Sequence, residues 1–265
     1  MSLAFAAHVR ETPVTRANPV TKLFAALAIT IVLLLSVDWV SAATALTLEL
    51  LVVPFCGITV PALLRRLTPV LVAAPTAGLV TCLIGEDSGP VLLALGPLDV
   101  TEGSLSSGVA IVLRVLAVGL PGVVLLATTD PTDLADALAQ RLRLPHRFVL
   151  GALAGLRLVG LMVEEWRVLA MARRARGIGD HQGVLGRVRV LAGQAFALLV
   201  LAIRRGTRLA TAMEARGFGA PGPRTWARPS TFAPRDAVLA LGAVVVAAAS
   251  VTAAVAAGTW SFILS

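Results

Sequence analysis

Charged and aromatic residues are scarce in this chain of 265 residues. Only 14% of the residues are charged and 5% are aromatic, tyrosine is absent, and Lys22 is the one lysine among 23 basic residues. Soluble domains carry about 25% charged residues, so this composition argues against an ordinary soluble protein. The shortage of aromatic rings leaves few side chains that could stack on bases. It therefore argues against nucleic acid as a partner, despite the net charge of +8.

The sequence also lacks the spacings that mark metal, redox and nucleotide sites. The two cysteines lie apart in apolar stretches, and the three histidines are scattered along the chain. A phosphate-binding loop requires the pattern Gly-x-x-x-x-Gly-Lys-Ser/Thr, and Lys22 does not lie in one. We therefore predict no metal site, no cofactor, no catalytic residue and no ATP-binding motif in this chain.

Apolar residues, in contrast, are abundant: 57% of the chain is hydrophobic and its mean hydropathy is +0.86. A helix that crosses the hydrocarbon core of a bilayer needs about 20 mostly apolar residues. We therefore predict an all-α, multi-pass protein of the cell inner (plasma) membrane with about five transmembrane helices. The predicted spans are residues 20–37, 40–60, 68–85, 105–128 and 237–264.

The charges between these spans predict their orientation. Arg10 and Arg16 precede the first span, Lys22 lies at its start, and Arg65 and Arg66 lie between the second and the third. Residues 86–102 contain four acidic residues and no basic one. Because basic connecting segments stay in the cytoplasm, we expect a cytoplasmic N-terminus and, after five crossings, a C-terminus outside.

The segment from Asp130 to Arg235 is far more polar, with 17 arginines and seven acidic residues. It contains two apolar runs. Residues 148–163 are interrupted by Arg157, and residues 191–203 are too few to span the bilayer. We predict helices packed just under the membrane, with an additional transmembrane hairpin as the alternative. The chain would thus comprise a membrane domain (1–129), a cytoplasmic domain (130–234) and a final transmembrane helix (235–265).

Capping signals predict three helices in the cytoplasmic domain. Asp130-Pro131 is typical of a helix start, and Pro145 ends that helix. Two long helices follow, from about His146 to Arg176 and from about Val184 to Arg216. Each is followed by a glycine, which favours a helix end because glycine readily adopts the left-handed conformation.

The ends of these two long helices are copies of each other. Residues 172–179 read Ala-Arg-Arg-Ala-Arg-Gly-Ile-Gly and residues 212–219 read Ala-Met-Glu-Ala-Arg-Gly-Phe-Gly, five identities in eight at a spacing of 40. One such sequence could be an ordinary helix cap. Two indicate a pair of arginines presented to two equivalent acidic sites, as on a dimeric partner or on two homologous subunits. The candidate coupling residues are Ala175, Arg176, Gly177, Ala215, Arg216 and Gly217.

In this order, the motifs resemble those of the transmembrane T component of energy-coupling factor (ECF) transporters, the family that includes the membrane subunit of cobalt importers. The resemblance covers nearly the whole chain. Besides the two Ala-Arg-Gly helix ends, it rests on Asn18-Pro-Val-Thr-Lys-Leu23, Thr128-Thr-Asp-Pro-Thr-Asp-Leu134, Leu144-Pro145, Leu156-Arg157, Glu164-Glu165 and Arg224-Thr225.

The resemblance implies a role in a larger transporter. In such transporters, two cytoplasmic ATPase subunits are each held by one Ala-Arg-Gly coupling helix of the T component. A separate small membrane protein, the S component, captures a vitamin or a metal ion. The T component transmits closure of the ATPases to the S component, so the two long helices would be coupling helices and the chain itself would not be an enzyme.

Charged residues outside the repeat are expected to be structural. Glu49 and Arg114 lie well inside predicted spans, where charges are costly, and we predict an ion pair between them. The alternative is that Arg114 bonds to backbone carbonyls while Glu49 faces a partner. We expect Arg157, Glu164 and Glu165 to take part in pairing within or between the long helices.

Three other functions fit parts of the sequence. The chain could be the permease subunit of a dedicated cobalt or nickel importer. It could be an intramembrane enzyme that uses Glu164, Glu165 and Asp130. It could also be a scaffold that binds acidic membrane lipids through its arginines, and lipid headgroups are expected partners of that basic face in any case.

Overall fold

The structure, a computed structural model, describes residues 10–36, 38–84, 90–95, 98–178, 183–220 and 225–260. The chain forms two compact units: unit 1 comprises Met1–Ala137 and Ser230–Ser265, and unit 2 comprises Leu138–Pro229. The sequence predicted a break at residue 130 and a separate final helix. In the structure the chain leaves unit 1 within helix α5 (Pro131–Arg141), and the final helix is part of unit 1.

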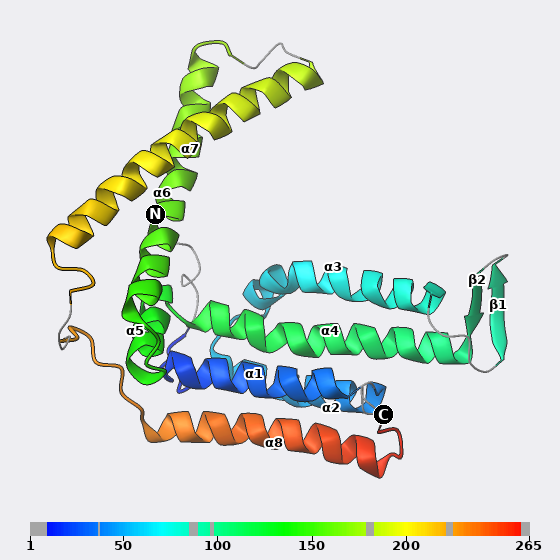
Figure 1. Cartoon of the computed structure of the whole chain (residues 1–265). Coiled ribbons are helices and arrows are strands. Elements are labelled where there is room, and N and C mark those ends of the chain that lie inside the picture. Colours follow the sequence, from blue (N-terminus) through cyan, green and yellow to red (C-terminus); the bar gives the residue numbers. More distant parts are fainter. Residues whose placement is uncertain are drawn as a thin grey trace. The chain divides into compact units, whose positions relative to one another are not determined.

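Unit 1 is a bundle of long helices that lie side by side (Figure 1). Helix α4 packs against α1, α2 and α3, and α8 packs against α1 and α2. The helices are α1 (Pro19–Leu35), α2 (Trp39–Val52), α3 (Val60–Ile84), α4 (Glu102–Thr128) and α8 (Pro234–Ala256). A short antiparallel hairpin, β1 (Val91–Leu95) and β2 (Leu98–Thr101), lies between α3 and α4 in an otherwise all-α chain. The sequence did not predict this hairpin.

Five helices among the described residues are long and apolar enough to cross a membrane, as the fold prediction expected. They are Trp39–Cys56, Val60–Ile84, Glu102–Thr128, Val184–Ala215 and Pro234–Ala256. This set differs from the predicted one. Helix α1, the predicted first span, has only 17 residues. Helix α7 (Val184–Ala215) is long and apolar enough to span, although it was predicted to lie under the membrane.

Two predicted boundaries of the membrane helices were wrong. Helix α2 ends at Val52 rather than near residue 60, because a short 3-10 helix (Val53–Cys56) follows and Gly57 then adopts a left-handed φ of 69°. Helix α3 starts at Val60, eight residues before the predicted span. Arg65 and Arg66 therefore lie within α3 and not in a connecting segment.

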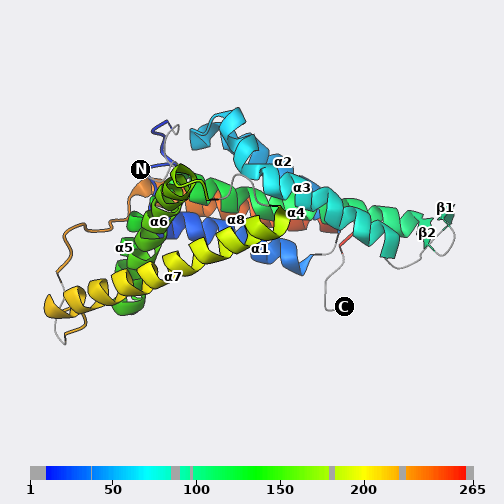
Figure 2. The same ribbon diagram turned by 90° about the horizontal axis from the view of Figure 1, so that it is seen from above.

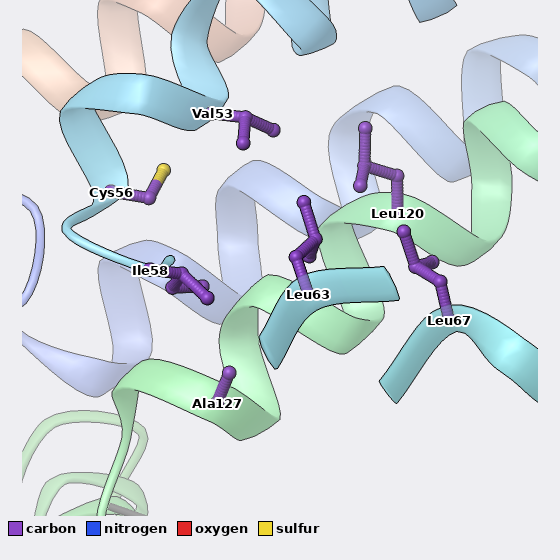
Figure 3. Close-up of a cluster of buried hydrophobic side chains, with 7 residues drawn as sticks. All are labelled: Val53, Cys56, Ile58, Leu63, Leu67, Leu120 and Ala127. Carbon is purple, nitrogen blue, oxygen red and sulfur yellow. The ribbon is translucent and has the colours of Figure 1, made fainter. Parts of the chain in front are cut away.

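The packing of unit 1 depends on small and aliphatic side chains. Figure 3 shows one buried cluster, in which residues of α3 and α4 meet those of the turn after α2. The cluster consists of Val53, Cys56, Ile58, Leu63, Leu67, Leu120 and Ala127. Further along the same pair of helices, a Cβ atom added at Gly78 would lie 2.8 Å from the backbone oxygen of Gly108. Glycine is therefore required for this approach of α3 to α4.

Unit 2 is built on two long helices, α6 (His146–Ala175) and α7, which cross each other (Figures 1 and 2). Their starts and ends agree closely with the predicted helices. Asp130 accepts a hydrogen bond from the Thr132 amide (2.7 Å) at the start of α5, as expected for a capping residue. Residues 179–182 and 221–224, which include Gly179 of the repeat and Arg224 of the family pattern, lie outside the described residues.

Candidate coupling site

The end of α6 is a Schellman motif. Arg176 is the C-cap, and Gly177 follows with a left-handed φ of 70°. The Gly177 amide donates to the Arg174 carbonyl (2.9 Å), and the Ile178 amide donates to the Arg173 carbonyl (3.0 Å). These two bonds satisfy carbonyls that the end of a helix would otherwise leave without partners. They fix the direction in which the chain leaves the helix after Arg176.

The end of α7 has the same geometry. Gly217 has a φ of 76°, and its amide donates to the Glu214 carbonyl at 2.9 Å. The Phe218 amide donates to the Met213 carbonyl, also at 2.9 Å. The backbone angles of the two cap residues are nearly equal, with φ −90° and ψ 9° at Arg176 and φ −90° and ψ 12° at Arg216. The sequence repeat is therefore also a repeat in backbone structure.

All six candidate coupling residues are exposed. Neither Arg176 nor Arg216 has a side-chain hydrogen bond or ion pair within the described part of the chain. A guanidinium group presents five N–H donors in a planar fork that suits bidentate pairing with a carboxylate. Each helix end thus presents one exposed arginine whose side-chain donors have no acceptor among the residues that the structure describes.

Polar contacts hold α6 and α7 together where they cross. Gln194, only 3% exposed, donates to the Trp166 carbonyl at 2.8 Å, and Arg173 donates to the Val190 carbonyl at 2.8 Å. Arg205 forms an ion pair with Glu165. Gln194 is the one polar residue within the apolar run 191–203 and was not among the predicted site residues.

The structure places the three charged residues predicted to pair on α6 in different surroundings. Glu165 bonds to Arg205 of α7, and both side chains are 35% exposed. Oε2 of Glu164 lies 3.8 Å from Nη1 of Arg167 on the same helix, within the range of an ion pair. Arg157 is exposed and has no ion pair among the described residues. Glu164 and Glu165 therefore each have a basic neighbour, which favours a structural role over acid–base chemistry.

Glu49 and Arg114 are not paired with each other. Arg114 donates to the backbone carbonyl of Ser36, just before α2, whereas Glu49 lies ten residues along α2 from Trp39, or about 15 Å. Helix α4 extends beyond the α1–α2 turn, so Arg114 is level with that turn and not with Glu49 (Figure 1). The Glu49 side chain is 7% exposed, and within the described segments its carboxylate oxygens have no hydrogen-bond partner.

Comparisons with known proteins identify the family. Residues 10–225 match the model of the family CbiQ, described as cobalt transport protein. The energy-coupling factor transporter transmembrane protein EcfT of Bacillus subtilis (strain 168) is 32% identical over 168 residues, which cover 60% of this chain and 63% of that protein. The EcfT of Heliobacterium modesticaldum (strain ATCC 51547 / Ice1) is 29% identical over 234 residues, which cover 85% of this chain and 87% of that protein.

A third relative carries a different name. A putative ABC transporter ATP-binding protein of Bifidobacterium longum (strain NCC 2705) is 28% identical over 194 residues, which cover 70% of this chain but only 25% of that protein. The apolar helices and the family match together describe a multi-pass membrane protein. Because the family model matches most of its length, the chain belongs to the CbiQ cobalt transport protein family, which includes the transmembrane T components of ECF transporters.

Proposed function

We propose that this chain is the transmembrane coupling subunit of an ATP-driven importer of the ECF type. It transmits the closure of two cytoplasmic ATPase subunits to a separate S component in the membrane, which captures a vitamin or a metal ion. The observation that carries this proposal is the duplicated helix end, in which Arg176 and Arg216 have the same backbone geometry and, among the described residues, no side-chain partner.

ATP hydrolysis belongs to the partners. The one lysine of the chain, Lys22, lies in no phosphate-binding pattern, so the chain has no motif of its own for ATP. The Bifidobacterium longum relative supports an ATPase partnership, because a protein named as ATP-binding contains a segment similar to this chain as about a quarter of its length. Two equivalent helix ends fit two ATPase subunits, identical or homologous.

The geometry of unit 2 suits mechanical coupling. The crossing of α6 and α7 is fixed by Gln194, by Arg173 and by the Arg205–Glu165 pair, so a displacement at one helix end moves the other helix as well. A flexible pair of helices would absorb the displacement. We further propose that unit 2 lies on the cytoplasmic side, that the N-terminus is cytoplasmic and the C-terminus outside, and that exposed arginines contact acidic lipid headgroups.

The test is co-purification of the tagged chain with its ATPase subunits. Truncating one member of a buried charge pair at an interface costs about 2–5 kcal/mol, so Arg176→Glu and Arg216→Glu should each weaken docking and the double variant should abolish it. Arg157→Glu is the matched control, since Arg157 is an exposed arginine of α6 away from the helix end and has no ion pair with any residue that the structure describes. A double variant that retains both ATPases as wild type does would refute the docking role.

A second candidate is a dedicated cobalt or nickel importer, which the description of the matched family favours. In that case the partner would be one metal-binding membrane protein, whereas a shared module would bind several vitamin-binding S components. Identifying the small membrane proteins that co-purify with the chain distinguishes the two candidates.

A further inference from the structure

Three polar side chains are buried where α1 begins, although they lie in or next to apolar helices. Asn18 is 6% exposed, Lys22 is 6% exposed and Asp236 is 3% exposed. Asn18 caps α1, Lys22 lies in its first turn and Asp236 lies in the first turn of α8. We call Asn18, Lys22 and Asp236 the collar. Buried polar groups are costly unless they are hydrogen-bonded, so their partners indicate what the collar holds.

Asn18 and Asp236 hold the segment that leads into α8. The backbone amide of Asn18 donates to Oδ1 of Asp236 (2.6 Å), while Oδ2 of Asp236 accepts from the backbone amide of Ala233 (2.6 Å). The side-chain amide of Asn18 donates to the Ser230 hydroxyl (2.8 Å) and to the Thr231 carbonyl (3.3 Å). The start of α1 is thus bonded to residues more than 200 positions later in the chain.

Lys22 holds the other connection, at the end of α4. Its ammonium group donates to the Thr128 carbonyl (2.9 Å) and to the Thr15 carbonyl (2.9 Å). Thr128 is the last residue of α4. An ammonium group has three N–H donors and carries a positive charge. Because Lys22 is buried, its two hydrogen bonds to carbonyl oxygens are charge-assisted and strong.

These contacts lie where the chain passes between the two units. After Thr128 the chain continues through α5 into unit 2, and it returns to unit 1 at Ser230. The collar therefore fastens both connections to the start of one apolar helix of unit 1, α1, which also packs against α4 and α8 (Figure 1). A displacement of either connection is then shared by α1, α4 and α8 instead of being lost in a flexible loop.

We propose that the collar is the anchor through which movement of unit 2 reaches the membrane helices. This inference rests on the proposed coupling function and assigns a role to Asn18 and Lys22 of the Asn18–Leu23 motif. The collar residues are positioning residues: they contact neither the ATPases nor a substrate, and they keep the ends of α1, α4 and α8 together while unit 2 moves.

The experiment uses the complex of the full chain with its ATPases in nanodiscs. Spin labels replace Leu185 in unit 2 and Val255 in unit 1, both of which are exposed, in a background without Cys56 and Cys82. The distance distribution between the labels is measured by electron paramagnetic resonance with and without ATP and vanadate. In the wild-type collar, a narrow distribution is expected to shift when nucleotide binds.

Lys22→Met keeps the length of the side chain and removes its donors. We expect the ATPases to remain bound and active, the distance distribution to broaden, and the nucleotide-dependent shift to be lost. Lys22→Arg, which can still donate to both carbonyls, should restore the shift. Arg235→Met is the matched control, because this exposed residue of the first turn of α8 is outside the collar.

Asn18→Ala is the milder second variant, because it leaves the backbone bond from residue 18 to Asp236 in place. It should assemble and reduce the shift. A wild-type shift in Lys22→Met or in Asn18→Ala would overturn the anchor role. Failure of the wild-type chain to bind ATPases would instead refute the proposed function, so the two failures are distinguishable.

Discussion

The left-handed glycine at each helix end offers a quantitative test of the coupling site. In Gly217→Ala, the added Cβ atom would meet no atom within 4 Å, so the cost is conformational and not steric. A residue other than glycine at the φ of 76° found here is disfavoured by roughly 1–2 kcal/mol. The last turn of α7 then opens more often, and the Gly217 and Phe218 amides lose their carbonyl partners for part of the time.

The expected consequence for docking follows from this cost. If the ATPase binds only the intact helix end, a cost of about 1 kcal/mol weakens binding by at most about fivefold, the limit reached when the helix end is already often open. That is far less than the effect expected for Arg216→Glu, which would remove the charge pair proposed between Arg216 and the ATPase. Gly177→Ala should behave like Gly217→Ala, because Gly177 has a φ of 70° and equally open surroundings.

The assay combines hydrogen exchange with a binding titration. Amide exchange at the end of α7 should accelerate in Gly217→Ala, and the dissociation constant for the purified ATPase should rise by up to the same factor. Gly206→Ala is the matched control: Gly206 lies within α7, has open space around it and no positive φ, so alanine should stabilise the helix by about 0.5–1 kcal/mol. Unchanged exchange and affinity in Gly217→Ala would refute the claim that the Schellman geometry positions Arg216.

Two further predictions concern helix contacts. Glu165→Arg and Arg205→Glu should each loosen the α6–α7 crossing, and the double swap should restore it. Because both side chains are about a third exposed, the coupling energy in a double-mutant cycle of unfolding should not exceed about 1 kcal/mol. A coupling energy of zero would show that this pair does not stabilise the crossing. Gly78→Ala should lower the apparent melting temperature in detergent, since its Cβ atom would lie 2.8 Å from a backbone oxygen of α4, at a cost of about 1–3 kcal/mol. Gly242→Ala is the control, because Gly242 has open space around it and alanine there should not lower the melting temperature. Equal melting temperatures for the two variants would contradict this packing.

Most of the candidate site was predictable from the sequence because helix ends depend on local residues. The glycines after Arg176 and Arg216 adopt the left-handed conformation that glycine readily adopts at helix ends. The repeat in the amino-acid sequence therefore predicted the repeat in backbone geometry. The helix start at Asp130-Pro131 was predictable for the same reason. What these ends bind stays a prediction, since it concerns partners.

Depth along a helix was harder to predict than its existence. Glu49 and Arg114 were expected to pair because both are charged residues that lie well inside predicted spans. The pairing failed because α4 extends beyond the α1–α2 turn, which brings Arg114 to Ser36. Hydropathy identifies an apolar stretch, but neighbouring helices and the connecting turns decide how far each helix extends and which residues are level with each other.

By itself, the sequence determined the class of protein, its helices and its repeated helix ends, because composition, apolar runs and capping residues act over short distances. Tertiary structure alone decided the contacts between distant segments. Nothing in the sequence connects the polar residues Asn18, Lys22 and Asp236 with their partners. The packing of α1 against α4 and α8 joins them into one network. Gln194 likewise gains a partner only where α6 crosses α7. Such hydrogen bonds join residues that no local pattern connects, and burial makes each of them necessary.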